Sequence, residues 1–305
     1  MTGESAQVPL SGLGEEAVLQ RLLSAFGSSA HDAGLLLGPG DDCAIARRDD
    51  VWDTLLKTDA LVEGVHFTPD TPPHLIGRKA LARAVSDVAA MGGLPELALV
   101  TLLVHGSRSV ELPEGIYAGM AELAAEFGIA LAGGETSSLP QDGLAVSVAL
   151  TGRVERGQAV LRSGGRAGDV LFVSGALGGS FESGRHLSFT PRVRLARHLL
   201  AIGLRPHAMM DLSDGLAVDL PRLARASHCG FVLKEEALPR HAGCTVRQAL
   251  SDGEDYELLL ALSPEQAAQL PAHPELDLSP IGYLTEGDAQ AMPGGWLHFS
   301  SSSYA

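Results

Sequence analysis

Residues 75–91, LIGRKALARAVSDVAAM, contain the pattern that decides the fold. Their apolar side chains recur at helical spacing and form one stripe, made of Leu81, Ala84, Val85 and Val88. Asp87 interrupts this otherwise apolar stretch in its C-terminal half. The sequence therefore predicts a long buried helix that carries a carboxylate.

Strand and helix patterns alternate on both sides of this helix. In the first half we expect strands at 51–59, 98–105, 129–134 and 145–154, and helices at 14–26 and 114–127. In the second half we expect strands at 170–173, 231–233, 256–262 and 280–284, and helices at 192–202 and 214–227. Interleaved strands and helices of this kind predict an α/β class with α+β character.

The chain has 305 residues, more than the roughly 100 to 200 of one typical domain. Residues 155–169, ERGQAVLRSGGRAGD, are rich in glycine and charge, which is typical of a boundary between domains. The sequence therefore predicts an N-terminal domain over residues 1–153 and a C-terminal domain over residues 154–305.

The charge balance excludes several classes of protein. There are 37 acidic and 22 basic residues, so the formal net charge is −15 and a nucleic-acid partner is disfavoured. No basic leader and no apolar run of about 20 residues is present, which argues against secretion and against a membrane partner. The three cysteines have no CxxC spacing, so we expect a cytoplasmic protein without disulfides or structural zinc.

Part of the acid is concentrated at strand ends, glycine turns and the apolar helix. The residues in such places are Asp41, Asp42, Asp59, Asp87, Glu135, Asp211, Asp214, Glu254 and Asp255. Carboxylates there are partly desolvated and need neutralisation, yet few basic residues lie nearby in sequence. Mg²⁺ takes one or two carboxylates while substrate phosphates complete its shell. The pattern therefore indicates a cation site for phosphoryl chemistry.

Each carboxylate also has an ordinary interpretation. Asp41 and Asp42 could stabilise a turn, and Asp87 could pair with Arg83 one helical turn away. Asp211 could be a helix cap, and Glu135 could lie on the surface. The sites taken together favour the cation site over these separate roles.

Two further features allow alternatives. The segment SGALGGS, residues 174–180, follows a strand and could cradle a phosphate or form a simple strand-to-helix turn. His66 could bind a ligand or could be a packed side chain beside Phe67. The P-loop, HExxH, GxSxG and complete EF-hand patterns are all missing from the sequence, so those classes are disfavoured.

In order along the chain, the motifs resemble the thiamine-monophosphate kinase family, within the superfamily of aminoimidazole ribonucleotide synthetase. The segments that carry the resemblance are GDDCAIA (40–46), KTDALVEGVHF (57–67), GRKALARAVSDVAAMGGLPE (77–96), AGGETS (132–137), LRSGGRAGDVLFVSGALG (161–178), MDLSDGLAVDL (210–220), SDGEDYELLL (251–260) and GWLHF (295–299). They span nearly the whole chain.

This resemblance implies a fold and an activity. The fold would be of the two-domain aminoimidazole ribonucleotide synthetase type, with an N-terminal sheet that forms the interface of a homodimer and a C-terminal domain that completes the substrate site. The activity would be in-line transfer of a phosphoryl group from ATP to thiamine monophosphate, assisted by Mg²⁺, which gives thiamine diphosphate. ATP would be a co-substrate, and no covalent nucleophile would be needed.

The resemblance also implies roles for individual residues. The metal ligands would be Asp42, Thr58, Asp59, Asp87, Glu135, Asp211 and Asp214. Of these, the residues central to catalysis would be Asp59, Asp87 and Asp214. The ATP contacts would be Tyr117, Gly134, Glu135, Arg162 and Ser213. The acceptor site would contain His66, Glu254 and Trp296, with the indole suited to stack on the thiamine rings.

Two departures from the family pattern concern the metal site. Lys57 stands where the family usually has a small hydroxyl residue, and Glu135 replaces an aspartate. Lys57 could contact a phosphate or displace one cation, so the number of Mg²⁺ ions is open. The alternatives to a thiamine-monophosphate kinase are another ATP-using enzyme of the superfamily with a different acceptor, and a non-catalytic regulator that binds metal and nucleotide.

Overall fold

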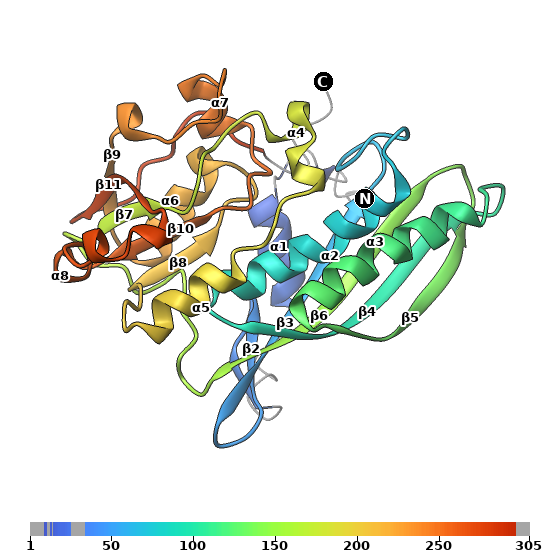
Figure 1. Cartoon of the computed structure of the whole chain (residues 1–305), viewed down its shortest axis with the longest axis horizontal. Helices are drawn as coiled ribbons and strands as arrows, with labels where there is room; N and C mark the ends of the chain where they lie inside the picture. Colours follow the sequence, from blue (N-terminus) through green and yellow to red (C-terminus); the bar gives the residue numbers. More distant parts are fainter. Residues whose placement is uncertain (1–8, 11–12, 14, 26–33, 297–305) are drawn as a thin grey trace, which may run out of the picture.

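A computed structural model describes residues 9–10, 13, 15–25 and 34–296 (Figure 1). Its framework is two β-sheets, one from each half of the sequence, with helices packed on them. The mixed α/β class predicted from the sequence is therefore confirmed.

The first sheet has six strands in the order β1-β2-β3-β6-β4-β5. The strands are β1 (Leu35–Leu37), β2 (Ala44–Arg47), β3 (Trp52–Val62), β4 (Leu94–His105), β5 (Ala130–Leu139) and β6 (Leu144–Glu155). Only the pair β4 and β5 is parallel; the other neighbours are antiparallel. Helices α2 (Pro73–Ala90) and α3 (Glu111–Phe127) lie on one side of this sheet (Figure 1).

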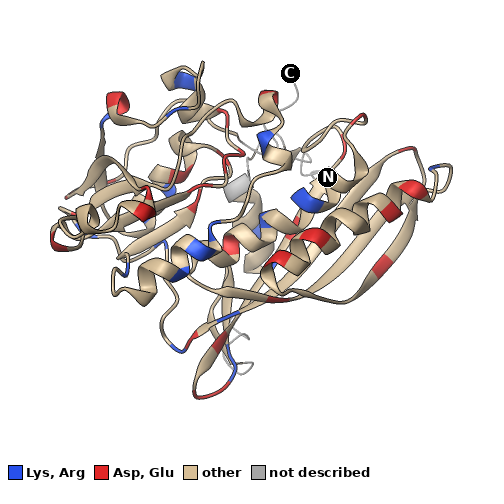
Figure 2. Ribbon diagram, viewed as in Figure 1, with Lys and Arg blue, Asp and Glu red and all other residues tan. Residues whose placement is uncertain are grey.

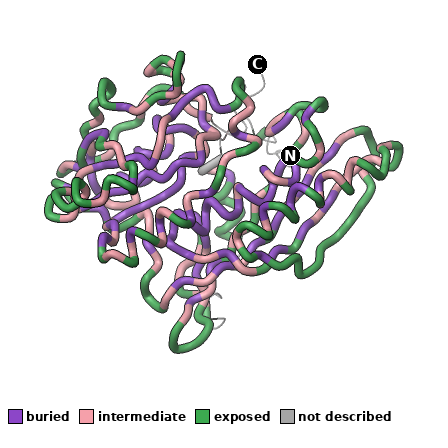
Figure 3. Tube along the Cα trace, viewed as in Figure 1, coloured by how far each residue is buried: buried purple, intermediate pink, exposed green. Residues whose placement is uncertain are grey.

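The α2 helix is buried along most of its length, as its composition predicts (Figure 3). Pro73 stands in its first turn, where a missing N–H costs nothing, and Gly92 in the left-handed region follows its end. The face of the first sheet that points away from the helices is partly exposed near β4 and β5. Leu97 and Leu99, which alternate with the buried Ala98 and Val100 along β4, are about half exposed there, at 49% and 50%. An apolar patch is thus left uncovered near the edge of the first sheet.

The second sheet has five antiparallel strands in the order β8-β10-β7-β11-β9. They are β7 (Val170–Val173), β8 (Ala208–Asp211), β9 (Gly230–Leu233), β10 (Leu258–Leu262) and β11 (Ser279–Thr285). Every residue of β10 is buried, because alternate side chains enter two separate cores. Helix α6 (Leu216–Ala226) belongs to one of these cores and α5 (Val193–Ala201) to the other.

The C-terminal half of α2 connects the two sheets. It contacts both α5 and β8, and Ala90 packs in the α5 core of the second sheet. The remaining helices are short or peripheral: α1 (Glu15–Ser24), α4 (Ser180–Ser183), α7 (Val246–Ser251) and α8 (Pro264–Ala267). Because α2 reaches across, its side chains can meet residues at the end of β8.

Several predicted boundaries were wrong, and three of them concern predicted site residues. Strand β3 continues to Val62, past Asp59, because it pairs with β6 along its whole length. Strand β5 extends to Leu139, so Glu135 lies within the strand, because β5 pairs with β4 as far as that residue. Helix α6 begins only at Leu216, since Gly215 has a φ of 99° that a helix cannot contain.

The predicted first helix is present as α1, but most of its expected apolar face is not buried. Val18 is buried, whereas Leu19, Leu22 and Leu23 are exposed; Phe26 lies outside the described residues. Within the described part of the chain, no helix is long and apolar enough to cross a membrane.

Candidate active site

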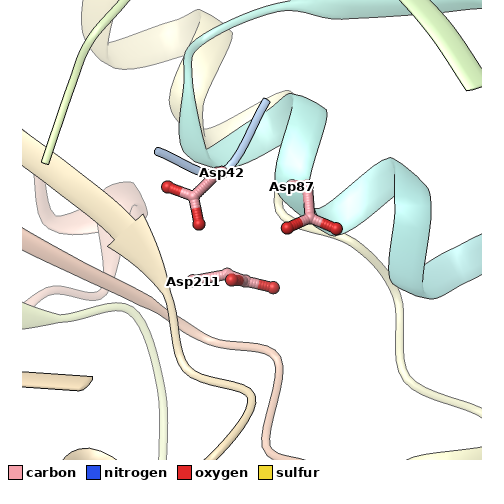
Figure 4. Close-up of side chains that lie close together, drawn as sticks. All are labelled: Asp42, Asp87 and Asp211. Carbon is pink, nitrogen blue, oxygen red and sulfur yellow. The ribbon is translucent and has the colours of Figure 1, made fainter. Parts of the chain in front are cut away.

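Three buried carboxylates meet where α2 approaches the second sheet. Asp42 comes from the turn between β1 and β2, Asp87 from α2, and Asp211 from the last residue of β8. One carboxylate oxygen from each lies within 4.8 Å of the other two. Figure 4 shows the three carboxylates around a common space. The structure thus brings together carboxylates that are far apart in sequence.

Two basic side chains partly balance this carboxylate cluster. Lys57 Nζ lies 2.7 Å from Asp87 Oδ1, and Arg162 Nη2 lies 2.6 Å from Asp42 Oδ1. The Ser86 hydroxyl donates to Asp211 Oδ2 at 2.7 Å. Asp42 Oδ2 is buried and has no hydrogen-bond partner among the described residues. A buried carboxylate oxygen without a partner is costly, so the cluster fits a cation with oxygen ligands.

The acid groups of the cluster are strongly perturbed. Burial raises the pKa of Asp211 to about 7, and the charge of Asp42 adds to this shift. Burial also raises the pKa of neighbouring Asp41 to about 6. Burial alone would lower the pKa of Lys57, but the carboxylates of Asp87 and Asp59 raise it overall. The cluster therefore holds protons near neutral pH, which a bound cation would displace.

Asp59 lies next to the cluster on β3. Its Oδ2 atom is 3.1 Å from Nε of Arg83, while Asp87 pairs with Lys57. The alternative that Arg83 neutralises Asp87 was therefore wrong. Lys57 and Asp59 both point from β3 toward α2. Asp87 and Arg83 therefore pair with these strand residues and not with each other.

Thr58 and Glu135 lie on the opposite face of the first sheet. Thr58 alternates with Lys57 and Asp59 on β3, and its hydroxyl is 3.5 Å from that of Ser147. Glu135 is exposed on β5 in register with Thr101, and it accepts a hydrogen bond from Ser137. Within one chain, the sheet separates these two predicted metal ligands from the carboxylate cluster.

The turn after β8 organises a second group of predicted residues. The Glu254 amide donates to the Ser213 carbonyl at 2.8 Å, and the Trp296 amide donates to the Asp214 carbonyl at 2.8 Å. The Asp214 carboxylate is paired with Arg222. Ser213, Asp214, Glu254 and Trp296 are thus neighbours, as the predicted phosphate and acceptor sites require.

His66 and Glu254 are held in defined charge states. Nδ1 of His66 accepts a hydrogen bond from the Val62 amide at 3.0 Å, and burial lowers the pKa of His66 to about 4. Burial would raise the pKa of Glu254, but the adjacent His186 ring and the charge of Lys79 lower it to about 2. At neutral pH the site therefore contains a neutral imidazole and an ionised carboxylate.

Comparisons with known proteins agree with this geometry. Models of the AIR synthase related protein match the chain twice, the N-terminal domain over residues 40–154 and the C-terminal domain over residues 166–293. Thiamine-monophosphate kinase of Rhodopirellula baltica is 42% identical over 223 residues, which cover 69% of this chain and 69% of that protein. The enzyme of the same name from Bacillus subtilis is 35% identical over 287 residues, 84% of this chain and 87% of that protein.

The chain belongs to the thiamine-monophosphate kinase family. A solved structure of AaThiL complexed with AMPPCP and TMP agrees at a TM-score of 0.83 and 32% identity, and the match covers 96% of this chain and 100% of that chain. The family resemblance and the two-part fold that it implied are therefore confirmed.

Two other predicted ATP contacts of this thiamine-monophosphate kinase family member, Tyr117 and Gly134, have positions that packing explains. Tyr117 packs on α3 against the first core, and no described contact joins it to the carboxylate cluster. Gly134 lies so close to β4 that a Cβ atom would be 1.9 Å from the Val100 carbonyl oxygen, so no larger residue fits. Figure 2 shows further acidic residues on α3, so only part of the acid surplus belongs to the site.

The glycine-rich segment at 174–180 is a structural turn. The Gly178 amide donates to Asp255 at 3.0 Å, and the Gly179 amide donates to Asp252 at 2.9 Å. Backbone donors that a phosphate would need are therefore already used by the chain's own carboxylates. Of the two interpretations of this segment, the contacts favour the turn.

Two buried residues that support the site were not predicted. Asp219 on α6 accepts hydrogen bonds from the Ser213 amide at 3.1 Å and the Asp214 amide at 3.0 Å, which fixes the turn after β8. Lys79 on α2 contacts Glu254 and has no exposed side-chain surface. Each is a charged residue within an apolar helical stretch, which is the same signal that identified Asp87.

Proposed function

We propose that the protein transfers the γ-phosphoryl group of ATP to the phosphate of thiamine monophosphate, which produces thiamine diphosphate. The observation that carries this proposal is the buried carboxylate cluster of Asp42, Asp87 and Asp211, with its unpartnered Asp42 oxygen. The names of the relatives and the AMPPCP and TMP of the AaThiL complex support the same substrates.

The cluster would hold Mg²⁺ through these three carboxylates, with Asp59 and Asp214 as further ligands. When bound, Mg²⁺ would act as a Lewis acid and neutralise phosphate charge. Phosphoryl transfer between two anions depends mainly on such neutralisation and on positioning, so a covalent nucleophile is not required. Cys43 beside the cluster is no candidate nucleophile, since burial raises the pKa of its thiol well above the ordinary value.

The chain's own residues prepare the site for nucleotide. Arg162 already lies at the edge of the cluster, where its guanidinium can exchange Asp42 for a phosphate oxygen. Ser213 stands in the turn fixed by Asp219. The placements of Arg162 and Ser213 support the predicted ATP contacts, whereas Gly134 is explained by close packing against β4 and Tyr117 by packing in the first core.

Lys57 supplies one positive charge that a metal ion would otherwise provide. Its ammonium group is bound to Asp87 inside the cluster, so we propose that it reduces the demand for divalent cations. Replacement by methionine removes the charge but keeps most of the side-chain volume.

We expect Lys57→Met to bind Mn²⁺ roughly tenfold more tightly or to bind one additional ion, because like charges a few ångströms apart repel strongly in a buried site. Electron paramagnetic resonance titration of Mn²⁺ at saturating AMPPCP measures both quantities. Lys234→Met, at an exposed lysine, is the matched control and should behave as wild type. Unchanged Mn²⁺ affinity and stoichiometry in Lys57→Met would show that Lys57 does not replace a cation.

We also propose a homodimer formed through the uncovered face of the first sheet. This face carries the exposed leucines of β4, Leu97 and Leu99, and Thr58 and Glu135 lie on the same face. A second copy packed there would bury the leucines and enclose both polar residues. The predicted division between residues 153 and 154 also stays a proposal; it lies two residues before the end of β6, and the segment that leads to β7 begins after Glu155.

Leu99→Glu should convert the dimer to a monomer, because it places a charge in the centre of the apolar contact. Sedimentation velocity at micromolar concentration measures the change. Val232→Glu, an exposed apolar residue on β9 of the second sheet, is the control and should leave the dimer intact. A monomeric wild-type protein, or a dimeric Leu99→Glu variant, would contradict this interface.

A coupled assay for ADP release tests the proposed activity. We expect ADP only when ATP, Mg²⁺ and thiamine monophosphate are all present. ADP release that needs a different acceptor would indicate another enzyme of the superfamily, and nucleotide binding without turnover would indicate a regulator.

A further inference from the structure

Lys79 is a fully enclosed charge on α2, with 0% of its side chain exposed. Its ammonium group contacts three acceptors: the His66 carbonyl at 2.6 Å, Nδ1 of His186 at 2.6 Å, and the Glu254 carboxylate. An ammonium group has three N–H donors, so all of them are used. Nothing is left for a direct contact with substrate.

The three acceptors come from three separate segments around the predicted acceptor site. His66 follows β3, His186 belongs to the short 3₁₀ turn at Arg185–Leu187, and Glu254 precedes β10. Lys79 itself lies on α2, which belongs to the first half of the chain. One buried cation thus joins the acceptor residues contributed by both halves.

The turn that carries Glu254 needs such support. Glu254 and Tyr256 have φ angles of 56° and 52°, in the left-handed region that side chains other than glycine rarely adopt. The Tyr256 hydroxyl donates to Glu254 Oε1 at 3.2 Å, while Lys79 binds Oε2. The carboxylate is therefore fixed at both oxygens on a strained backbone, which is typical of a preorganised binding group.

We infer that Lys79 is a positioning residue for the acceptor: it holds Glu254 and the His66 segment in the arrangement that receives thiamine monophosphate. The inference rests on the proposed function, because it assigns Glu254 and His66 to the acceptor site. It predicts a selective effect on one substrate. A cation that only stabilised the contact between the two halves would affect both substrates or neither.

The test compares Lys79→Met, Glu254→Gln and the double variant in steady-state kinetics. We expect Lys79→Met to raise KM for thiamine monophosphate roughly 10- to 100-fold and to change KM for ATP less than about twofold. The KM of the double variant for thiamine monophosphate should be within about threefold of the KM of Glu254→Gln alone, because both changes disable the same carboxylate. Equal effects on the two substrates, or effects that multiply in the double variant, would overturn the inference.

Arg197→Met is the matched control. Arg197 also joins the two halves, through Glu155 at 2.6 Å and the Gly92 carbonyl at 2.9 Å, but it lies on α5 and contacts none of the acceptor residues. We expect this variant to lower the melting temperature and to leave both KM values unchanged. If wild-type protein shows no turnover with thiamine monophosphate, the proposed function fails; if it turns over and Lys79→Met does not alter KM, only the inference about Lys79 fails.

The wild-type protein provides a second test should Lys79→Met not fold. Burial lowers the pKa of Lys79 to about 8, with Glu254 opposing the shift, so the ammonium group loses its proton above that pH. The charged and titratable groups around it are Arg83, Asp59, His66, His186, Glu254 and Tyr256. KM for thiamine monophosphate should rise severalfold between pH 7 and 9 while KM for ATP stays constant. A flat KM for thiamine monophosphate over this range would contradict the inference.

Discussion

Asp211→Asn should lower kcat at least a thousandfold and, in the absence of metal, raise the melting temperature. The first effect follows because the cluster loses a cation ligand and a negative charge that faces the phosphates. The second follows from its pKa of about 7 in the folded protein, against about 3.9 in an unfolded chain. Between about pH 4 and pH 7 the folded state therefore binds more protons at this residue than the unfolded state does. For this reason the free energy of unfolding falls as pH rises over that range.

Asparagine mimics the protonated form, so the variant should retain this stability at pH 8. We expect a melting temperature roughly 2 to 6 °C above that of metal-free wild type, and no further increase when Mg²⁺ and AMPPCP are added. Differential scanning calorimetry with and without Mg²⁺ measures both values.

Asp169→Asn is the control for this experiment. Asp169 is equally buried and pairs with His207 at 2.9 Å, but it lies before β7, outside the carboxylate cluster. Its replacement should reduce stability and leave kcat within about threefold of wild type. If Asp211→Asn destabilised the metal-free protein and kept its activity, the cluster would be a structural network and not a cation site.

Asp59→Asn should abolish kinase activity while the fold survives. Asp59 lies beside the cluster, and its carboxylate is bound to Arg83 and to the Ala60 amide, so an amide of the same shape can keep part of these contacts. The lost charge should cost about 3 kcal/mol or more of transition-state stabilisation, which corresponds to a hundredfold or greater loss in kcat/KM. Circular dichroism and the coupled assay distinguish loss of activity from loss of structure.

Asp53 provides a matched control on the same strand. It is buried, points to the same face of β3, and accepts a hydrogen bond from the Gly157 amide at 2.8 Å, away from the cluster. Asp53→Asn should lower stability and leave kcat nearly unchanged. Full activity in purified Asp59→Asn would refute the assignment of Asp59 to the metal site.

The sequence predicted only part of the cluster. Asp87 was recognisable because a carboxylate in an apolar helix needs a partner. Strand β8, which ends at Asp211, was not among the predicted strands. The meeting of Asp87 and Asp211 with Asp42 depends on how α2 crosses from the first sheet to β8. That crossing follows from tertiary packing, which sequence spacing does not encode.

The partners of these residues were less predictable. Arg83 one turn before Asp87 was the obvious candidate, yet strand β3 places Lys57 there and gives Arg83 to Asp59. Lys79 and Asp219 were not predicted for a related reason. Lys79 contacts backbone and carboxylate groups that are distant in sequence, and Asp219 contacts a turn whose shape depends on glycine. Only the packed structure reveals these contacts.

The predicted metal ligands were also not equivalent in space. Alternation along β3 puts Asp59 beneath α2 and Thr58 on the opposite face, with Glu135. A strand pattern of period two contains this information once the pairing register is known. The sequence defined the strand but not which of its faces the helices would cover.

The most direct test of the account is the identity of the product. After incubation of the protein with ATP, Mg²⁺ and thiamine monophosphate, mass spectrometry should detect thiamine diphosphate and ADP in equal amounts. The same incubation with Asp211→Asn should yield neither above background. ADP without thiamine diphosphate, or unchanged thiamine monophosphate after prolonged incubation with folded wild-type protein, would contradict the proposed function.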